Sequence, residues 1–347
     1  MTDSGPHTAG VAPDGAGSNR PNRGAEAIRS LLGADWSSAL IALIALFAII
    51  GVLHPEFLRP TQLVNVVQQS AYIAIMAAGV CFLLTQGEVD LSVGGNYVLA
   101  SVVAALLIQN GIAPWAAAVV AIGLALVVGA LNALIVLVVR IPSLIATLAM
   151  GWVLHGLASA ISEGKQIVGL PIDDSFFMIL GGGSFLGLPI SVWTLILVVG
   201  GLTVVLRRTP FGFRVREIGS NAEAAAFSGI PINRTKVMAF LLCGGLAGLS
   251  GMLGLAFFTS GDPTTGGGFE LFAVAGAVIG GNPLSGGSAT VFGAAVGAIL
   301  LNAVSTGLVY FNIPASWSQF ATGAVILLAV SLDGLIRSRR QAAASRE

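Results

Sequence analysis

The chain has 347 residues, of which 55% are hydrophobic and only 9% are charged, and its mean hydropathy is +0.91. Soluble domains carry about 25% charged residues, so this composition excludes a water-facing surface and predicts one that faces a lipid bilayer. The 16 basic and 16 acidic residues give a net charge of zero, which excludes a nucleic-acid binder because no basic field neutralises phosphates. Cys81 and Cys243 lie inside apolar runs and predict core residues rather than a disulfide.

The uncharged stretches predict an all-α polytopic membrane protein, since one crossing takes about 20 mostly apolar residues. Residues 1–34 are polar and lack the apolar core of a signal peptide, so we expect a disordered cytoplasmic tail. Residues 35–336 form the expected membrane domain, and 337–347 a basic cytoplasmic tail. Tryptophans and turn residues divide the membrane domain into about ten expected helices, at residues 37–53, 64–86, 91–108, 114–138, 143–161, 191–206, 237–258, 270–281, 289–311 and 316–333.

The distribution of basic residues predicts the orientation, because cytoplasmic loops retain Lys and Arg. Ten helices place both termini on one side, and with the amino terminus inside, 14 of the 16 basic residues are cytoplasmic. Arg59 and Lys165 are the two that lie outside. Loop 207–236 is therefore expected in the cytoplasm, and connection 163–190 outside.

Two similar segments indicate an internal repeat. Residues 87–95 follow the second expected helix and residues 261–268 follow the seventh, and both combine a glycine, an acidic residue and a later glycine pair. An odd number of helices separates the segments, which predicts an inverted repeat of five helices, as is common in transporters. Chance in a chain with 46 glycines is the alternative.

Glycines spaced four residues apart in the expected helices predict close helix packing. Three such pairs occur, at Gly244 and Gly248, Gly276 and Gly280, and Gly293 and Gly297. We expect neighbouring helices to approach closely at these glycines.

Loop 207–236 contains a segment typical of a short helix ended by glycine, Glu-Ala-Ala-Ala-Phe-Ser-Gly at residues 223–229. Its early glutamate is favoured by the helix dipole. The segment resembles the docking helix of ABC importer permeases, which has Glu-Ala-Ala, three residues and then Gly. The resemblance implies an ATPase-coupling site formed by Arg216, Asn221, Glu223, Ala224, Ala225 and Gly229.

Over residues 40–333 the chain resembles the ribose-type sugar permeases, a family that also carries xylose, galactose and related small polyols. Glu88, His155 and Phe272 depart from the family pattern, where glycine, arginine and an acidic residue are usual. The matching runs, in order, are Asp-Leu-Ser-Val-Gly at 90–94, Ile-Pro-Ser at 141–143, Ile-Gly-Ser-Asn at 218–221, residues 223–230, Glu-Leu at 270–271, Leu-Ser-Gly-Gly at 284–287 and Asp333.

The resemblance implies a permease subunit of an ABC importer rather than an enzyme. It further implies an extracytoplasmic solute-binding protein that delivers the sugar, and a second permease chain, identical or related. The chain has no Gly-x-x-x-x-Gly-Lys-Ser/Thr phosphate loop, so we expect no cofactor on this chain and place ATP and Mg²⁺ on separate ATP-binding subunits. The sugar itself is not fixed, and branched-chain amino acids or nucleosides remain open.

Two other function classes remain as alternatives. An ion-coupled secondary transporter of a small polar solute is suggested by Glu88, Asp90 and the repeat. An intramembrane enzyme is disfavoured, because no activated nucleophile or metal cluster is found in the sequence.

Polar residues in or beside the apolar spans are candidates for the transport pathway or its gate, because acids there are costly unless they face water or a partner. Solvation is the alternative for the acids, and hydrogen bonding between helices is the alternative for the uncharged residues. Asp262 and Glu270 fall on the expected external side and are candidate contacts to the delivery protein or to a loop. The pathway candidates are Glu88, Asp90, Ser92, Asn96 and Asn302.

Overall fold

The computed structural model describes residues 36–318, 320–328 and 331, all of which belong to one unit, 35–347. The expected tails, 1–34 and 337–347, lie outside these residues. The described part is mostly helical, with one short antiparallel hairpin and an isolated β-bridge between Ile167 and Gly261. Its elements are α2 (Ser37–Leu53), η1 (Pro55–Leu58), α3 (Pro60–Thr85), α4 (Val93–Gln109), α5 (Pro114–Leu134), η2 (Ile135–Val139), α6 (Ser143–Ile161), η3 (Phe177–Gly181), β1 (Ser184–Phe185), β2 (Leu188–Pro189), α7 (Ile190–Arg208), α8 (Pro210–Ser220), α9 (Ala222–Phe227), α10 (Ile232–Phe258), α11 (Phe269–Ile279), α12 (Val291–Tyr310) and η4 (Ala315–Trp317).

Proline and glycine set many of the helix ends. Pro60 and Pro114 occupy the first positions of α3 and α5, where the fixed φ of proline suits the helix and its missing N–H removes no hydrogen bond. Gly87 and Gly111 follow the ends of α3 and α4 with φ of 74° and 87°, a conformation in which a side chain would be strained. The observed helices therefore begin and end close to the turns that the sequence indicates.

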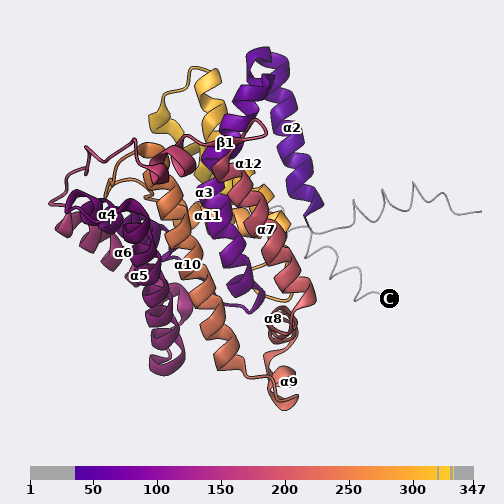
Figure 1. The fold of residues 1–347 in the computed structure, drawn as a ribbon. Coiled ribbons are helices and arrows are strands. Elements are labelled where there is room, and N and C mark those ends of the chain that lie inside the picture. The colour runs from indigo at the N-terminus through magenta and orange to yellow at the C-terminus, as the bar shows by residue number, and fades with distance from the viewer. Residues whose placement is uncertain (1–35, 319, 329–330, 332–347) are drawn as a thin grey trace, which may run out of the picture. The chain divides into compact units, whose positions relative to one another are not determined.

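Helices α3 and α10 lie side by side at the centre of the unit (Figure 1). Helix α10 also packs against α4 and α5, and α3 packs against α11 and α12. Residues 93–102 of α4 are all buried, so this short helix is enclosed by protein rather than by lipid. The apolar core lies mainly among these six helices.

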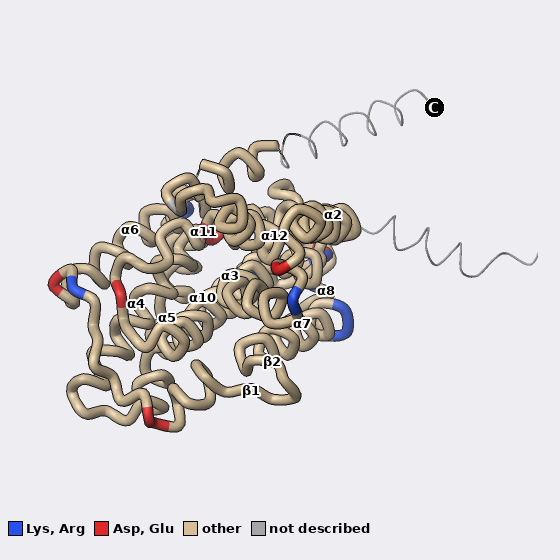
Figure 2. The backbone as a smooth tube through the Cα atoms, turned by 90° about the horizontal axis from the view of Figure 1, so that it is seen from above, with Lys and Arg blue, Asp and Glu red and all other residues tan. Residues whose placement is uncertain are grey.

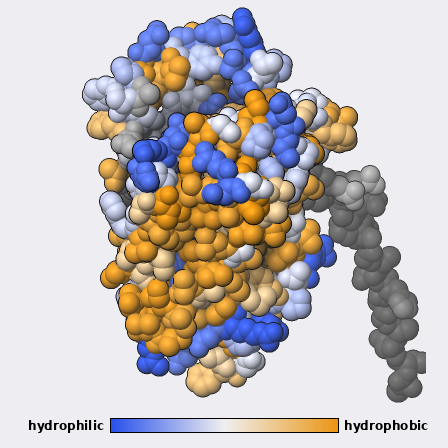
Figure 3. All heavy atoms as spheres, turned by 60° about the vertical axis from the view of Figure 1, so that its left-hand side comes forward, coloured by the Kyte–Doolittle hydropathy of each residue, from blue (hydrophilic) through white to orange (hydrophobic). Residues whose placement is uncertain are grey.

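The outer helices expose apolar side chains on their outward faces (Figure 3). Val119 of α5 is 71% exposed and Trp152 of α6 is 75% exposed, as expected for residues that contact lipid. Six described helices are long and apolar enough to cross a membrane, namely α3, Pro114–Val139, α6, α7, α10 and α12, while α2, α4 and α11 are apolar but shorter. The expected total of ten crossings stays a prediction, and its last helix, 316–333, lies only partly within the described residues.

Close helix packing at the three glycine pairs is confirmed. A Cβ on Gly297 of α12 would overlap the carbonyl of Gly276 in α11, and one on Gly293 would overlap the carbonyl of Gly280. On the other side of the molecule, a Cβ on Gly244 of α10 would approach the carbonyl of Ala125 in α5 at 2.5 Å. These helices can therefore approach closely only because side chains are absent at the contacts.

We predict that Gly297→Ala destabilises the protein by about 1–3 kcal/mol, because the added methyl group forces α12 away from α11. Gly200→Ala in α7 is the matched control, since nothing lies within 4 Å of its Cβ position, and alanine favours a helix by up to about 1 kcal/mol. Thermal unfolding of both variants in the same detergent gives the measurement. Equal stability of the two variants would contradict the packing role of the α11–α12 glycines.

Candidate functional site

Residues Pro210–Ile230, which we call the α8–α9 unit, project from one end of the helices (Figure 1). The chain turns from α7 into α8 at Thr209, whose Oγ1 accepts a hydrogen bond from the N–H of Gly212 at 3.2 Å. Pro210 then occupies the first position of α8, which suits the fixed φ of proline. The turn is thus defined locally by sequence, and it separates α8 from the apolar helix that precedes it.

Helix α9 has only six residues and is closed at both ends by hydrogen bonds. Asn221 is its N-cap, and its Oδ1 accepts a hydrogen bond from the N–H of Ala224 at 2.9 Å. At the other end Gly229 has a φ of 78°, and its N–H donates to Ala226 while the N–H of Ile230 donates to Ala225. This pair of bonds is a Schellman motif. The helix would be marginal alone, so these caps explain how so short a segment holds a fixed shape.

Most of α9 faces outward. Ala225 is only 4% exposed and is the helix's one buried residue, whereas Phe227 is 86% exposed. Glu223 lies in the first turn and is exposed, where its charge suits the helix dipole. A rigid helix that presents an uncovered aromatic ring has the character of a protein-contact element, because aromatic residues are enriched in interfaces.

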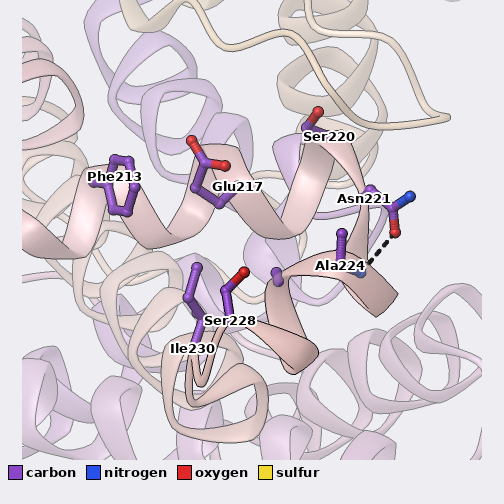
Figure 4. Close-up of a pocket in the computed structure, with 8 residues that line it drawn as sticks. Phe213, Glu217, Ser220, Asn221, Ala224, Ser228 and Ile230 are labelled. Atoms are coloured by element: carbon purple, nitrogen blue, oxygen red, sulfur yellow. Dashed lines mark hydrogen bonds between the residues drawn. The ribbon is translucent and has the colours of Figure 1, made fainter.

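A cleft of about 260 Å³ separates α8 from α9. Figure 4 shows Ser228 and Ile230 extending toward α8 from the end of α9. The eight residues that line the cleft include both polar and apolar side chains, and such a lining suits a short protein segment better than a purely apolar ligand. They are Phe213, Glu217, Ser220, Asn221, Ala224, Ala225, Ser228 and Ile230.

Helix α8 is attached to the end of α3. The ring of Phe211 stacks on that of Phe82, with centroids 5.8 Å apart and planes 6° apart. The carbonyl of Thr85 accepts a hydrogen bond from the N–H of Gly287 at 3.1 Å, and a Cβ on Gly219 would overlap the same carbonyl. The last turn of α3 therefore contacts both α8 and the α11–α12 loop.

An ion pair provides a second link at this end of the molecule. Lys236, in the first turns of α10, binds Glu88 in the α3–α4 loop with 2.5 Å between Nζ and Oε1. Their side chains are 19% and 15% exposed, so the pair is more shielded from water than a surface salt bridge. Glu88 thus joins the loop after α3 to the helix that follows the α8–α9 unit.

Basic residues lie beside α7 and α8, whereas few charges lie among the central helices (Figure 2). Arg207 and Arg208 occupy the last turn of α7, where positive charge suits the helix dipole. Arg216 is exposed, and its Nε–H donates to the carbonyl of Gly212 at 3.4 Å. The end of the molecule that carries α8 and α9 is therefore rich in basic residues, as the sequence predicts for the cytoplasmic end.

Asp90 and Ser92 are both only 1% exposed and belong to a buried hydrogen-bond network. Asp90 Oδ1 accepts hydrogen bonds from the N–H and the hydroxyl of Ser92 at 2.8 and 2.6 Å. Asn132 of α5 donates to the Ser92 oxygen at 2.7 Å. The network joins the start of α4 to α5 and satisfies Asp90 Oδ1 and the Ser92 hydroxyl, whereas the buried Oδ1 of Asn132 has no hydrogen-bond partner among the described residues.

Two other pathway candidates bond neighbouring helices. The Asn96 amide donates to the carbonyls of Ala125 and Gly244 at 3.1 and 3.4 Å, and that of Asn302 donates to Ser70 Oγ at 3.0 Å. These contacts favour the interpretation as bonds between helices. A role of these residues or of Asp90 in the pathway stays a prediction.

The two acids expected on the external side lie in different surroundings. Asp262 is partly exposed, and its Oδ1 accepts hydrogen bonds from the N–H and hydroxyl of Thr264 at 2.8 and 2.7 Å. Glu270, in the first turn of α11, lies against Gly94 of α4. Its Oε2 is inaccessible and has no hydrogen-bond partner among the described residues. Contact of either acid with a delivery protein stays a prediction.

Three residues that the sequence analysis does not single out belong to these sites in the structure, one in the Asp90 network and two at or near the α8–α9 unit. Asn132 is a lone polar residue in an apolar helix, which was a usable signal for a buried hydrogen bond. Phe227 lies inside the docking-helix pattern, but only the structure reveals its exposure. Lys236 pairs with a residue 148 positions away, and no local pattern could have indicated that partner.

Comparison with known proteins identifies similar chains. Residues 62–330 match the model of the family described as branched-chain amino acid transport system / permease component. The ribose import permease protein RbsC of Bacillus subtilis is 36% identical over 84% of this chain and 91% of its own length. The L-arabinose ABC transporter permease protein AraH of Azospirillum brasilense is 35% identical over 88% and 89%, and the autoinducer 2 import system permease protein LsrC of an Enterobacter strain is 32% identical over 89% and 90%.

We predict that reversing either charge of the Glu88–Lys236 pair destabilises the protein by about 2 kcal/mol, because two like charges then share a partly buried site. The variants are Glu88→Lys and Lys236→Glu, and the double variant is expected to recover more than half of the loss. Thermal unfolding in detergent measures all three. A double variant whose loss equals the sum of the single losses would show that the two side chains do not interact.

Proposed function

The chain belongs to the permease-component family of branched-chain amino acid transport systems, and we propose that it is the membrane-spanning subunit of an ATP-driven sugar importer. The observation that carries this proposal is the capped helix α9, which projects from one end of the helices with Phe227 uncovered. A membrane subunit without an ATP-binding loop needs such a contact in order to receive the free energy of ATP hydrolysis from another chain.

The α8–α9 unit is the proposed docking site for an ATP-binding subunit, which supplies the ATP and Mg²⁺ sites. Phe227 enters a pocket of that subunit, and Asn221, Glu223 and Gly229 hold the helix in the docking shape. Support comes from the two end caps of α9 and from its exposure. Contacts of α8 with α3 then connect the docked subunit to the membrane-embedded helices.

A small sugar or related polyol is the proposed cargo, delivered by an extracytoplasmic solute-binding protein. Three relatives carry names that refer to ribose, L-arabinose and autoinducer 2. The names "import permease" and "ABC transporter permease" favour ATP over an ion gradient as the energy source. A second permease chain, identical or related, completes the proposed pathway across the bilayer.

The proposed topology has ten crossings, cytoplasmic termini and two inverted halves. Contacts between α3 and α10 support the inversion. Ser250 of α10 hydrogen-bonds the carbonyl of Tyr72 in α3, whereas Lys236 at the other end of α10 binds Glu88 beyond α3. The two helices are therefore antiparallel, and each leads into a short helix, α4 or α11. Corresponding helices of opposite direction are what an inverted repeat requires.

Phe227→Ala tests the proposed docking site. Removing an aromatic anchor from an interface commonly costs about 2 kcal/mol, so we predict that affinity for the ATP-binding subunit falls about 30-fold. Phe185→Ala is the matched control, because Phe185 is 59% exposed in the hairpin at the opposite end of α7. Retention of the ATP-binding subunit on the tagged permease, measured against subunit concentration, gives both affinities.

Equal affinities for the two variants would contradict docking at α9. Sugar uptake by vesicles containing the permease, the ATP-binding subunit and the delivery protein checks the energy source. We expect uptake to require ATP and to survive a protonophore. Uptake that stops with the protonophore but continues without ATP would instead establish the ion-coupled alternative.

A further inference from the structure

Glu270 is a partly buried acid in a chain that is poor in charge. Glu270 lies against Gly94 of α4. The next residue, Gly95, packs against Gly151, which lies midway along the 19-residue α6. Glu270 therefore lies at the level of the middle of a membrane-spanning helix. No basic side chain of the described residues pairs with it, although acids at this depth are costly unless they meet a partner or line a water-filled path.

Two helix amino termini converge on this carboxylate. Glu270 is the second residue of α11, and Gly94 is the second residue of α4. A Cβ on Gly94 would overlap Glu270 Oε2 and would lie 3.1 Å from the backbone nitrogen of Glu270, so the first turns of the two helices are in contact. Helix amino termini favour negative charge, which explains how the carboxylate is held without a cation.

The surrounding charges restrict what this carboxylate can bind. A cation is disfavoured by the two positive helix ends, and an anion is repelled by the carboxylate itself. A neutral molecule with several hydroxyl groups meets neither penalty, because hydroxyls donate hydrogen bonds to a carboxylate and such charge-assisted bonds are strong. The Glu270 carboxylate is an acceptor of this kind, because the residue is partly exposed and its Oε2 has no hydrogen-bond partner among the described residues.

Aromatic side chains lie between Glu270 and the carboxyl-terminal end of α10. The ring of Tyr97 lies 5.4 Å from that of the neighbouring Phe269, and its hydroxyl lies against Gly254 of α10. Tyr72 packs 6.0 Å from Phe257 on the next turn of α10, and its buried hydroxyl has no partner among the described residues. Aromatic faces and one unpaired hydroxyl among apolar helices are typical of binding sites in which a few polar groups are set in an apolar lining.

We propose that Glu270 is a binding station for a neutral polyol midway through the permease, where its carboxylate accepts hydrogen bonds from adjacent hydroxyl groups of the cargo. The proposal rests on the importer function above and assigns a specificity-determining residue to it. Helix amino termini that meet at mid-depth are also a feature of the sites in which many transporters hold their substrates. Glu270 then discriminates among cargoes by their hydroxyl groups rather than by their charge.

Glu270→Gln tests the proposal in vesicles that contain the permease, the ATP-binding subunit and the delivery protein. D-ribose is the probe, and 2-deoxy-D-ribose, which lacks one hydroxyl, is its comparison. We expect ribose uptake to fall about 10-fold or more, since a hydrogen bond to a charged group is stronger than one to an amide. The preference for ribose over 2-deoxy-D-ribose is expected to fall to within about 2-fold, as the site no longer rewards the extra hydroxyl.

Glu163→Gln is the control, because Glu163 is 76% exposed and pairs only with Lys165 at the surface, and we expect it to leave uptake unchanged. Gly94→Ala is a second test variant, since it retains the carboxylate but places a methyl group at Oε2. It should lower ribose uptake as well. The delivery protein is the same in every sample, so a change in discrimination arises in the permease.

Retention of the ATP-binding subunit and ATP hydrolysis are measured on the same preparations, together with thermal stability. Normal ribose uptake and normal discrimination in a folded Glu270→Gln or Gly94→Ala variant would overturn the binding station while leaving the importer function intact. Failure of the unaltered chain to retain any ATP-binding subunit would instead overturn the importer function itself.

Discussion

The contact of the Thr85 carbonyl with Gly219 and Gly287 is the interaction on which the rest of the arrangement depends. It places the last turn of α3 against α8 on one side and against the α11–α12 loop on the other. A side chain at Gly219 would occupy the position of that carbonyl, so this approach requires glycine. Because α3 packs along α10, α11 and α12, a force applied to the α8–α9 unit reaches the centre of the molecule through backbone contacts rather than through flexible side chains.

Three acidic residues, Glu88, Asp90 and Glu270, are stabilised in three different ways. Glu88 is paired with Lys236, and Asp90 is enclosed by hydrogen bonds from Ser92. The ion pair and the hydrogen bonds each satisfy an acidic side chain, and they also hold it in one position. Glu270 has neither partner, and two helix ends provide its electrostatic support. Of these three acids, Glu270 is therefore the one best suited to exchange hydrogen-bond partners with a passing solute.

Much of the fold was predictable because apolar length is set by the bilayer and turns are set by proline and glycine. The expected helix at 143–161 agrees with α6 at both ends, since Pro142 and a polar segment bound it. Helix α10 begins at Ile232 rather than 237, because Arg234 and Lys236 were assigned to a loop by charge although a helix can continue beyond the apolar region. Helix α8 was not predicted, because it lacks the long apolar run that marks a membrane helix. Its position depends on contacts with α3 that the sequence does not reveal.

The candidate site was predictable in part for the same reasons. Residues 223–229 have a local pattern, so the sequence predicted α9 and its terminal glycine. Lys236, which pairs with Glu88, and Gly94, which lies against Glu270, are both distant in sequence from these acids, and their positions are set by the antiparallel packing of α3 with α10 and by the meeting of α4 with α11. Such pairs depend on three-dimensional register, which local propensity does not determine.

Site-directed cross-linking in native membranes tests most directly whether α9 is the docking element. Ser228→Cys places a thiol beside the α8–α9 cleft, and Ser184→Cys places one in the exposed hairpin at the other end of α7. The natural cysteines, Cys81 and Cys243, are 0% exposed, so only the introduced thiols are open to a cross-linker. We predict that the thiol at 228 joins the chain to its ATP-binding subunit and that the thiol at 184 does not. Membranes that transport sugar normally but yield no cross-link at 228, or equal cross-linking at both positions, would contradict the account.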